Sequence, residues 1–145
     1  MDNPELLSIF TTIAGFIVGL GSVTVIDIHG ALGRTSGYWR AAAVRTHKVT
    51  KPLIWIGITL VGLGYLLSSS YYLYTPWLWG VYAVLVVNGS FLSFVISPKL
   101  LANEKAKKPE EQLPTVWQIC VIVSAIISFC GWWSSLLIYL HVLLN

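Results

Sequence analysis

The chain has 145 residues, of which 56% are hydrophobic and only 10% are charged. Soluble domains carry about 25% charged residues, so this composition excludes an ordinary water-soluble domain and predicts a membrane protein. The formal net charge of +3 is better explained by contact with anionic lipid headgroups than by nucleic-acid binding.

Three long stretches without a charged side chain predict four membrane-spanning helices. They run from Leu6 to Ile26, from Pro52 to Pro98 and from Gln112 to Asn145. A helix needs about 20 apolar residues to cross the hydrocarbon core, so the middle stretch holds two passes, separated by a polar break at residues 68–76. The predicted fold is one all-α transmembrane domain, a bundle of four helices with spans at 6–28, 53–72, 77–96 and 116–144.

All nine lysines and arginines fall in two connections on one side of the predicted bundle. Five lie in residues 29–52 and four in residues 97–115. The positive-inside rule assigns such connections to the cytoplasm, so both termini are expected on the non-cytoplasmic side of the inner (plasma) membrane. The acidic start of the chain is unlike the basic n-region of a signal peptide, so the first span is expected to be retained.

Small and hydroxylated residues form a stripe along the first span at alternating spacings of four and three residues. Gly15 and Gly19 within it match a small-xxx-small pattern, which allows close helix approach. The fourth span carries a similar stripe. The members are Ser8, Thr12, Gly15, Gly19 and Ser22 in the first span, and Cys120, Ser124, Ser128, Gly131 and Ser135 in the fourth. Both stripes predict tight helix contacts, within the chain or against a neighbouring subunit.

Asp27 is the only acidic residue inside a predicted span, and it lies in the last turn or so of the first one. A carboxylate within a membrane is a functional candidate by default. Because five basic residues follow it, an interfacial ion pair with Arg34 or Arg45 is the simpler interpretation. A role in ion or proton handling is the alternative.

The first connection is expected to leave the span as a flexible glycine-rich segment and to become helical from Tyr38 to Thr50. Thr35 or Ser36 is the expected helix cap. The glycines around Arg34 lack the lysine–hydroxyl ending of a P-loop, so a phosphate loop is not indicated. The second connection mixes lysine, glutamate and proline, and it is expected to be a solvated, partly mobile connector.

Asn88 lies in the middle of the third span, with Ser93 about one turn away. An amide at this depth needs a hydrogen-bond partner and should face protein. A hydrogen bond between helices is the simpler interpretation, and contact with a solute or ion is the alternative. Asp27, Asn88, Ser93 and Thr12 together form the candidate polar path of the sequence.

The remaining reactive residues indicate no catalytic or metal site. His29 and His47 lie in the first connection and His141 near the opposite end, so no pair sits at mid-membrane depth for haem. Cys120 and Cys130 are ten residues apart, about 15 Å along one helix, too far for a disulfide. Without a nucleophile–base pair or paired carboxylates, the chain is not expected to be an enzyme. No cofactor is predicted, although haem is left open.

Several segments resemble a family of small, uncharacterised four-span bacterial integral membrane proteins. They are Gly15-x3-Gly19-x-Gly21-Ser22 followed by Asp27, Arg45-Thr46 with residues 54–57, residues 88–100 and residues 128–135. The resemblance covers most of the chain and implies a four-helix bundle, without an activity. The layout is also similar to the CopD-like and HemJ-like proteins, in which a first-span histidine serves haem or metal. Thr12 stands at that position here.

Three functional hypotheses follow. The first is a non-enzymatic accessory subunit that packs within a larger membrane assembly through its small-residue faces. The second is a small, oligomeric transporter or ion channel that uses Asp27 and Asn88. The third is a haem- or quinone-associated redox subunit. The expected partners are the lipid bilayer and either other membrane subunits or further copies of the chain, with no nucleic acid.

Overall fold

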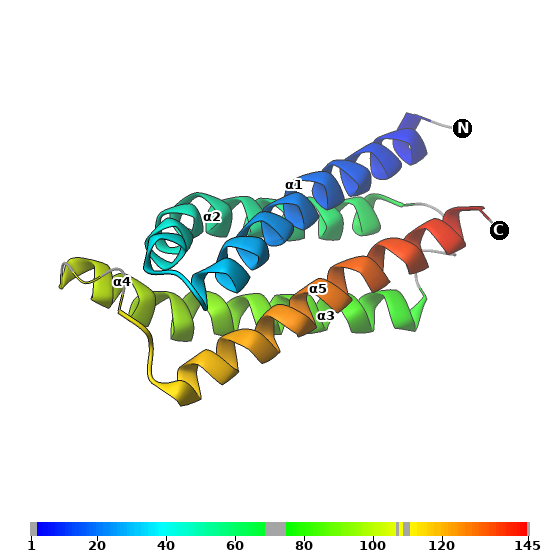
Figure 1. The fold of residues 1–145 in the computed structure, drawn as a ribbon. Helices are drawn as coiled ribbons and strands as arrows, with labels where there is room; N and C mark the ends of the chain where they lie inside the picture. The colour runs from blue at the N-terminus through cyan, green and yellow to red at the C-terminus, as the bar shows by residue number, and fades with distance from the viewer. Residues whose placement is uncertain (1–2, 69–74, 107, 109–110, 145) are drawn as a thin grey trace.

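The computed structural model describes residues 3–68, 75–106, 108 and 111–144, and these residues form helices and short connections without a strand. In chain order the elements are α1 (Asn3–Gly33), α2 (Gly37–Leu67), α3 (Pro76–Phe91), the π-helix η2 (Leu92–Ile96), α4 (Ser97–Lys105) and α5 (Thr115–Leu144) (Figure 1). Four helical stretches are long and apolar enough to cross a membrane, as in a multi-pass membrane protein. The predicted all-α class with four such helices is therefore confirmed.

The helices continue beyond the predicted spans at the end of the bundle that carries α4. α1 and α2 have 31 residues each, or about 46 Å of helix, which exceeds the hydrocarbon core of about 30 Å. The connection expected at 29–52 is consequently helical except for residues 34–36, and α4 occupies the first part of the connector expected at 97–115. The hydropathy of the sequence identifies only the apolar part of each helix. The backbone hydrogen bonds of the same helix continue into the polar residues beyond it, and hydropathy does not reveal this. The polar break expected at 68–76 falls mostly outside the described residues.

A short turn joins α1 to α2. The Arg40 guanidinium on α2 donates a hydrogen bond of 2.9 Å to the carbonyl of Gly33, one of the carbonyls that the end of α1 leaves without a helical partner. Ser36 occupies the N-cap position of α2 with an extended backbone, but its side chain makes no capping hydrogen bond. Ser36 therefore occupies the predicted cap position, but its hydroxyl does not cap the helix.

The bundle consists of two closely packed helix pairs, α1 with α2 and α3 with α5. α1 and α2 cross at their glycines: a Cβ atom placed on Gly57 would lie 2.5 Å from the Cα of Gly19, and one on Gly15 would lie 2.6 Å from the backbone nitrogen of Val61. The Ser8 hydroxyl donates a 2.7 Å hydrogen bond to the carbonyl of Gly64 further along the same interface. The small-residue stripe of the first span thus packs inside the chain.

α3 and α5 are joined by hydrogen bonds as well as by packing. The Asn88 amide donates a 3.0 Å hydrogen bond to the Ser124 carbonyl, and the Ser124 hydroxyl donates to the Asn88 side-chain oxygen. Gly131 lies against Leu85, so that a Cβ there would come within 2.8 Å of the leucine side chain. Part of the fourth-span stripe therefore also faces a helix of the same chain.

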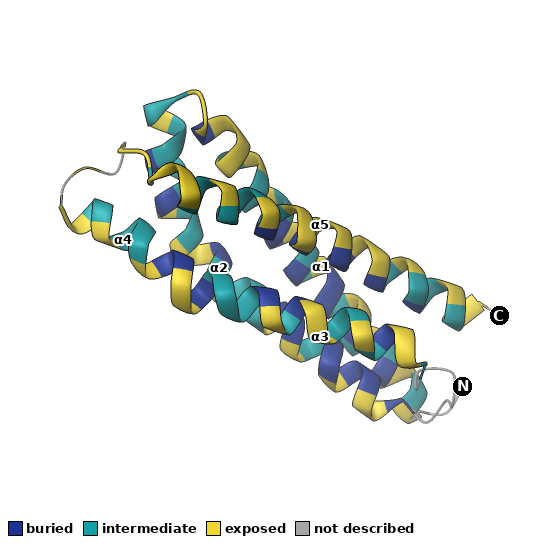
Figure 2. Ribbon diagram, turned by 90° about the horizontal axis from the view of Figure 1, so that it is seen from below, coloured by how far each residue is buried: buried dark blue, intermediate teal, exposed yellow. Residues whose placement is uncertain are grey.

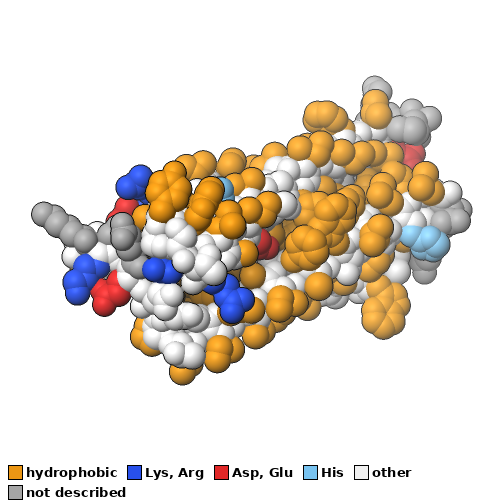
Figure 3. All heavy atoms as spheres, in the orientation of Figure 1, with side chains coloured by type: hydrophobic (Ala, Val, Ile, Leu, Met, Phe, Trp, Pro, Cys, Tyr) orange, Lys and Arg blue, Asp and Glu red, His pale blue; other side chains and the backbone are white. Residues whose placement is uncertain are grey.

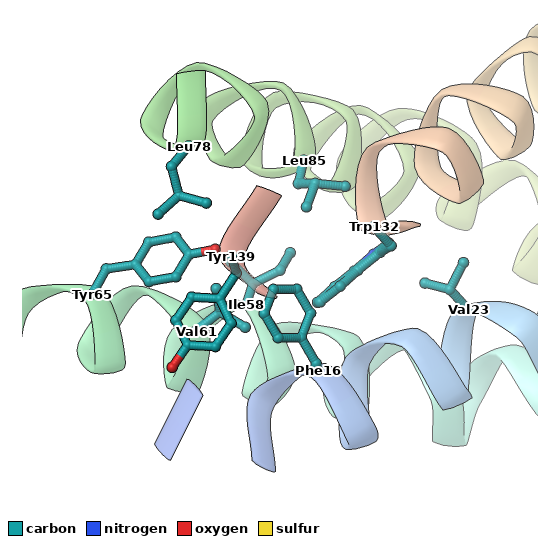
Figure 4. Close-up of a cluster of buried hydrophobic side chains, with 9 residues drawn as sticks. All are labelled: Phe16, Val23, Ile58, Val61, Tyr65, Leu78, Leu85, Trp132 and Tyr139. Atoms are coloured by element: carbon teal, nitrogen blue, oxygen red, sulfur yellow. The ribbon is translucent and has the colours of Figure 1, made fainter. Parts of the chain in front are cut away.

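Six aromatic side chains from all four long helices form the half of the core nearest the termini. We call this group the aromatic layer: Phe16, Tyr65, Trp79, Tyr82, Trp132 and Tyr139. Phe16 packs edge-on to Trp132 with ring centroids 6.1 Å apart, and Tyr65 stacks on Tyr139 at 6.0 Å. Figure 4 shows the rings of Phe16, Tyr65, Trp132 and Tyr139 pointing into one cluster with Leu78 and Leu85. Trp132 is 1% exposed and belongs to the core.

The outer surface shows the division of charge that the sequence suggests. Buried residues face the interior of the bundle, and exposed ones face outward along its whole length (Figure 2). Hydrophobic side chains cover most of the face in Figure 3, and lysines and arginines gather at the end that carries α4. We call this the basic end. Both termini lie at the opposite end (Figure 1).

Candidate functional site: a cavity at the basic end

A cavity of about 370 Å³ lies between the two helix pairs at the basic end. Its wall is built from α1, α2, α3, η2, α4, α5 and residues 111–113, and most of the lining side chains are apolar. Sites for small organic ligands have volumes of about 300–1,000 Å³ and walls of this character. The cavity has the size and composition of a ligand site.

The inner boundary of the cavity is the aromatic layer. Trp132 and Leu85 belong both to the cavity wall and to the buried core. The indole ring of Trp132 extends over Gly19, where a Cβ atom would collide with it. The space that the glycine leaves is filled by an aromatic side chain, so the core closes at this depth.

Asp27 lines the cavity without an ion pair or hydrogen bond within the described part of the chain. Its Oδ2 atom is buried and has no hydrogen-bond partner. The expected ion pair with Arg34 or Arg45 is absent from the described structure, because α1 does not end near Asp27 but continues to Gly33. Arg34 follows seven residues later, about 10 Å further along the axis. The acid and Arg34 therefore face the same cavity at different depths.

His47 presents a second polar atom without a partner to the cavity. Its Nε2 is buried and makes no hydrogen bond within the described structure. His29, in contrast, bonds through Nδ1 to the Val25 carbonyl at 2.8 Å and packs edge-on to Trp39. Among the described residues, no three His, Cys, Asp or Glu side chains lie close enough together to hold a metal ion.

Ser93 lies in the π-helix η2, where α2 reaches across to the α3–α5 pair. The Lys51 ammonium group donates a 3.1 Å hydrogen bond to the Ser93 carbonyl, and the indole nitrogen of Trp55 donates a 2.9 Å bond to the Ser93 hydroxyl. Lys51 and Trp55 are one helical turn apart, so both project from one face of α2. Both Lys51 and Ser93 line the cavity. This clasp fixes the cavity wall between α2 and η2.

Pro98 has no backbone N–H, and this explains why the Ser93 carbonyl is available to Lys51. In η2 the backbone N–H of Ser97 bonds to the carbonyl of Leu92 instead of that of Ser93. The next possible donor to Ser93 in the π register is residue 98, and proline has no N–H. Lys51 supplies the missing donor. π-helical turns are often found at functional sites, and here the turn leaves a carbonyl free for a side chain across the cavity.

The candidate polar path of the sequence is not continuous. Asp27 and Ser93 meet at the cavity, whereas Asn88 is bonded to Ser124 between α3 and α5. Thr12 lies in the half that contains the aromatic layer, where its hydroxyl bonds to the Ser8 carbonyl and its side chain packs against Gly64. Of the predicted packing residues, Ser128 is buried and lines the cavity, and Ser22 is buried on α1.

Sequence reasoning did not identify the cations as part of a site. Arg34, Arg40 and Lys51 line the cavity, yet in the sequence they are only loop charges that indicate orientation. The signal available was the helical spacing of Arg40, Ala43, His47, Lys51 and Ile54, which places these residues on one face of α2. The spacing indicates a shared face only if residues 38–50 and the second span form one continuous helix, as they do in α2.

No family model, curated protein or solved structure matches this chain. The case for a function therefore depends on the geometry and chemistry of the cavity.

Proposed function

We propose that the protein is a small membrane carrier whose solute-binding chamber is the cavity at the basic end. The observation that carries this proposal is a ligand-sized space, lined by Asp27 and His47 with partnerless buried atoms, that ends at the aromatic layer. A carboxylate removed from water is costly unless it is paired, protonated or bound to a ligand. A chamber lined by such a group therefore has a polar atom that a proton, water or a polar group of a bound solute can satisfy.

The proposal includes the orientation that the positive-inside rule gives, with the basic end in the cytoplasm. In this arrangement the chamber faces the cytoplasm and the aromatic layer separates it from the other side. A carrier moves its solute by alternating between two such states. The structure would then correspond to the inward-facing one, and the outward-facing state requires the aromatic layer to open.

The accessory-subunit hypothesis has less support from the geometry. It depends on small-residue faces being available to a partner, yet Gly15, Gly19 and Gly131 pack against helices of the same chain. The subunits that accompany the protein on purification from native membranes still provide a direct test. A visible absorption spectrum of the same sample tests the redox hypothesis, since bound haem absorbs strongly.

Transport is tested by uptake into proteoliposomes with two probes of the same bicyclic aromatic shape and opposite fixed charge. These are naphthalene-2-sulfonate and N-methylquinolinium, which cross lipid slowly because their charge cannot be neutralised. A carrier gives saturable uptake of at least one probe. Empty liposomes provide the background.

A pair of variants on α5 links uptake to the cavity. Ala125 lines the cavity, so Ala125→Phe should fill it and reduce saturable uptake by about tenfold or more, the effect expected when a ligand loses its site. Val123 is exposed on the same helix, so Val123→Phe should leave uptake unchanged. Equal uptake by both variants, or no saturable uptake of either probe by the unmodified protein, would refute the carrier proposal.

A further inference from the structure

We infer that the chamber selects monovalent anions that carry a compact apolar body, with the charged group at the mouth and the apolar body toward Trp132. This inference rests on the proposed function and specifies its substrate class. It is drawn from the positions of the charges along the cavity and from the contacts that those charges make.

The mouth of the cavity is positively charged, because Arg34 and Arg40, at and just after the turn between α1 and α2, line the cavity at the basic end. Lys51 lies further in along α2 and donates to the Ser93 carbonyl, a neutral group that leaves its positive charge uncompensated. Arg34 is exposed, and its guanidinium forms no ion pair within the described residues. A guanidinium is well suited to carboxylate, sulfonate or phosphate oxygens, because its N–H groups form a planar fork.

The acidic residues of the cavity do not cancel this charge at the mouth. Glu111 lies 3.5 Å from the Lys108 ammonium group and is compensated by it. Asp27 lies on α1 about 10 Å from Arg34 along the helix axis. An anion held by Arg34 is therefore separated from Asp27, whereas a second negative charge on the inner part of the ligand would approach it. This separation favours a ligand with one charge at one end.

The inner part of the cavity suits an apolar body. Its wall there includes Ile54, Ile58, Leu85, Ile122 and Trp132. A flat ring fits against the indole of Trp132, because aromatic rings gain about 0.5–1.5 kcal/mol from such contacts beyond the area that they bury. A small inorganic anion would leave this apolar surface unused, so the chamber should prefer an organic one.

Equilibrium dialysis with the full chain in lipid nanodiscs tests the inference with three probes of the same shape. Naphthalene-2-sulfonate is anionic, N-methylquinolinium is cationic and 2-naphthylmethanol is neutral. We expect the anion to bind at least about threefold more tightly than either of the others, a difference within the range that a solvent-exposed ion pair produces. Empty nanodiscs correct for partition of each probe into lipid.

Two arginine variants identify the residue that recognises the charge. Arg34→Gln should weaken binding of naphthalene-2-sulfonate about threefold to fivefold, the range expected for a solvent-exposed ion pair, and leave the neutral probe unaffected. Arg45→Gln is the matched control, because Arg45 is an exposed arginine on α2 that does not line the cavity. Both positions are exposed, so neither change should disturb folding, which the elution profile on size-exclusion chromatography checks.

The outcomes separate the inference from the carrier proposal. Preference for the cation, or equal effects of Arg34→Gln and Arg45→Gln, would overturn the anion assignment while the carrier proposal stands, provided that Ala125→Phe still blocks binding. Binding of all three probes that is unchanged by Ala125→Phe would show that the cavity is not the site. That result would overturn both.

Discussion

At the residue scale, Gly57 has the least space for a side chain among the points where two backbones meet. A methyl group there would lie 2.5 Å from the Cα of Gly19 and 2.6 Å from its nitrogen, and backbone atoms cannot move aside as a flexible side chain can. Gly21, on the exposed side of α1, has nothing within 4 Å of an added Cβ. The same substitution can therefore be compared at a crowded helix crossing and at an open surface position.

Gly57→Ala should therefore destabilise the protein and Gly21→Ala should not. Overpacking of a tight contact costs about 1–3 kcal/mol, while alanine in place of glycine in a helix contributes up to about 1 kcal/mol of stability. Thermal unfolding in detergent, followed by tryptophan fluorescence, should show a lower midpoint for the first variant and an equal or higher one for the second. Equal midpoints would mean that α1 and α2 do not cross at these glycines.

The same scale shows why the candidate site could be predicted only in part. Asp27 and Ser93 stand out in the sequence because polar residues in a span need an explanation, and both reach the cavity. Asn88 stands out for the same reason, but it is bonded to Ser124. A single sequence shows which side chains need a partner within the membrane. It does not show whether that partner is another helix or a ligand, because this depends on how the helices face each other.

At the element scale, the long helices could be predicted from the sequence, whereas the π-helix η2 and its contact with α2 could not. Uncharged stretches of sufficient length identify four spans from hydropathy alone. The π-helix η2 has no comparable signal, since it depends on which carbonyl the N–H of Ser97 selects. Pro98 removes one alternative donor, and Lys51 compensates from a residue 42 positions away from Ser93 in the chain. Such a contact becomes visible only when α2 and η2 are placed side by side.

The clasp predicts an energetic coupling between Lys51 and Pro98. Lys51→Met leaves the buried Ser93 carbonyl without a donor, at a cost of about 1–3 kcal/mol. Pro98→Ala restores a backbone N–H next to that carbonyl, so Lys51→Met should cost less in the Pro98→Ala background. A double-mutant cycle measured by unfolding in mixed detergent reports the difference as a coupling free energy.

Lys48→Met is the control for this cycle. Lys48 lies on the same helix and pairs with Glu104 at 2.8 Å on an exposed surface, where such pairs contribute at most about 1 kcal/mol. Its cost should be the same in the unmodified protein and in the Pro98→Ala background. A cycle for Lys51 with no coupling would show that the ammonium group does not replace the missing N–H.

At the scale of the whole molecule, the bundle has two unlike halves. Near the termini the aromatic layer joins all four long helices, with Tyr65 also hydrogen-bonded to Ser135 at 3.1 Å. At the basic end the two helix pairs leave room for the cavity, and the clasp at Ser93 holds α2 to the opposite pair. Access to the cavity should therefore be possible from the basic end and blocked from the other.

Cysteine labelling tests this access together with the orientation of the chain. Ser128→Cys, in a background with Cys120 and Cys130 changed to alanine, introduces a thiol of similar size in the cavity wall. A membrane-impermeant anionic methanethiosulfonate should modify it only from the side that also modifies Ser36→Cys, at the turn between α1 and α2. Leu144→Cys, which replaces a side chain 80% exposed near the C-terminus, should react from the opposite side.

Sealed vesicles of known orientation assign these two sides. The positive-inside rule places Ser36→Cys and Ser128→Cys on the cytoplasmic side. Ala125→Phe should slow modification of Ser128→Cys and leave Ser36→Cys unchanged, because it fills the cavity without altering the surface. Modification of Ser128→Cys from the same side as Leu144→Cys would mean that the aromatic layer is not the closed end of the bundle.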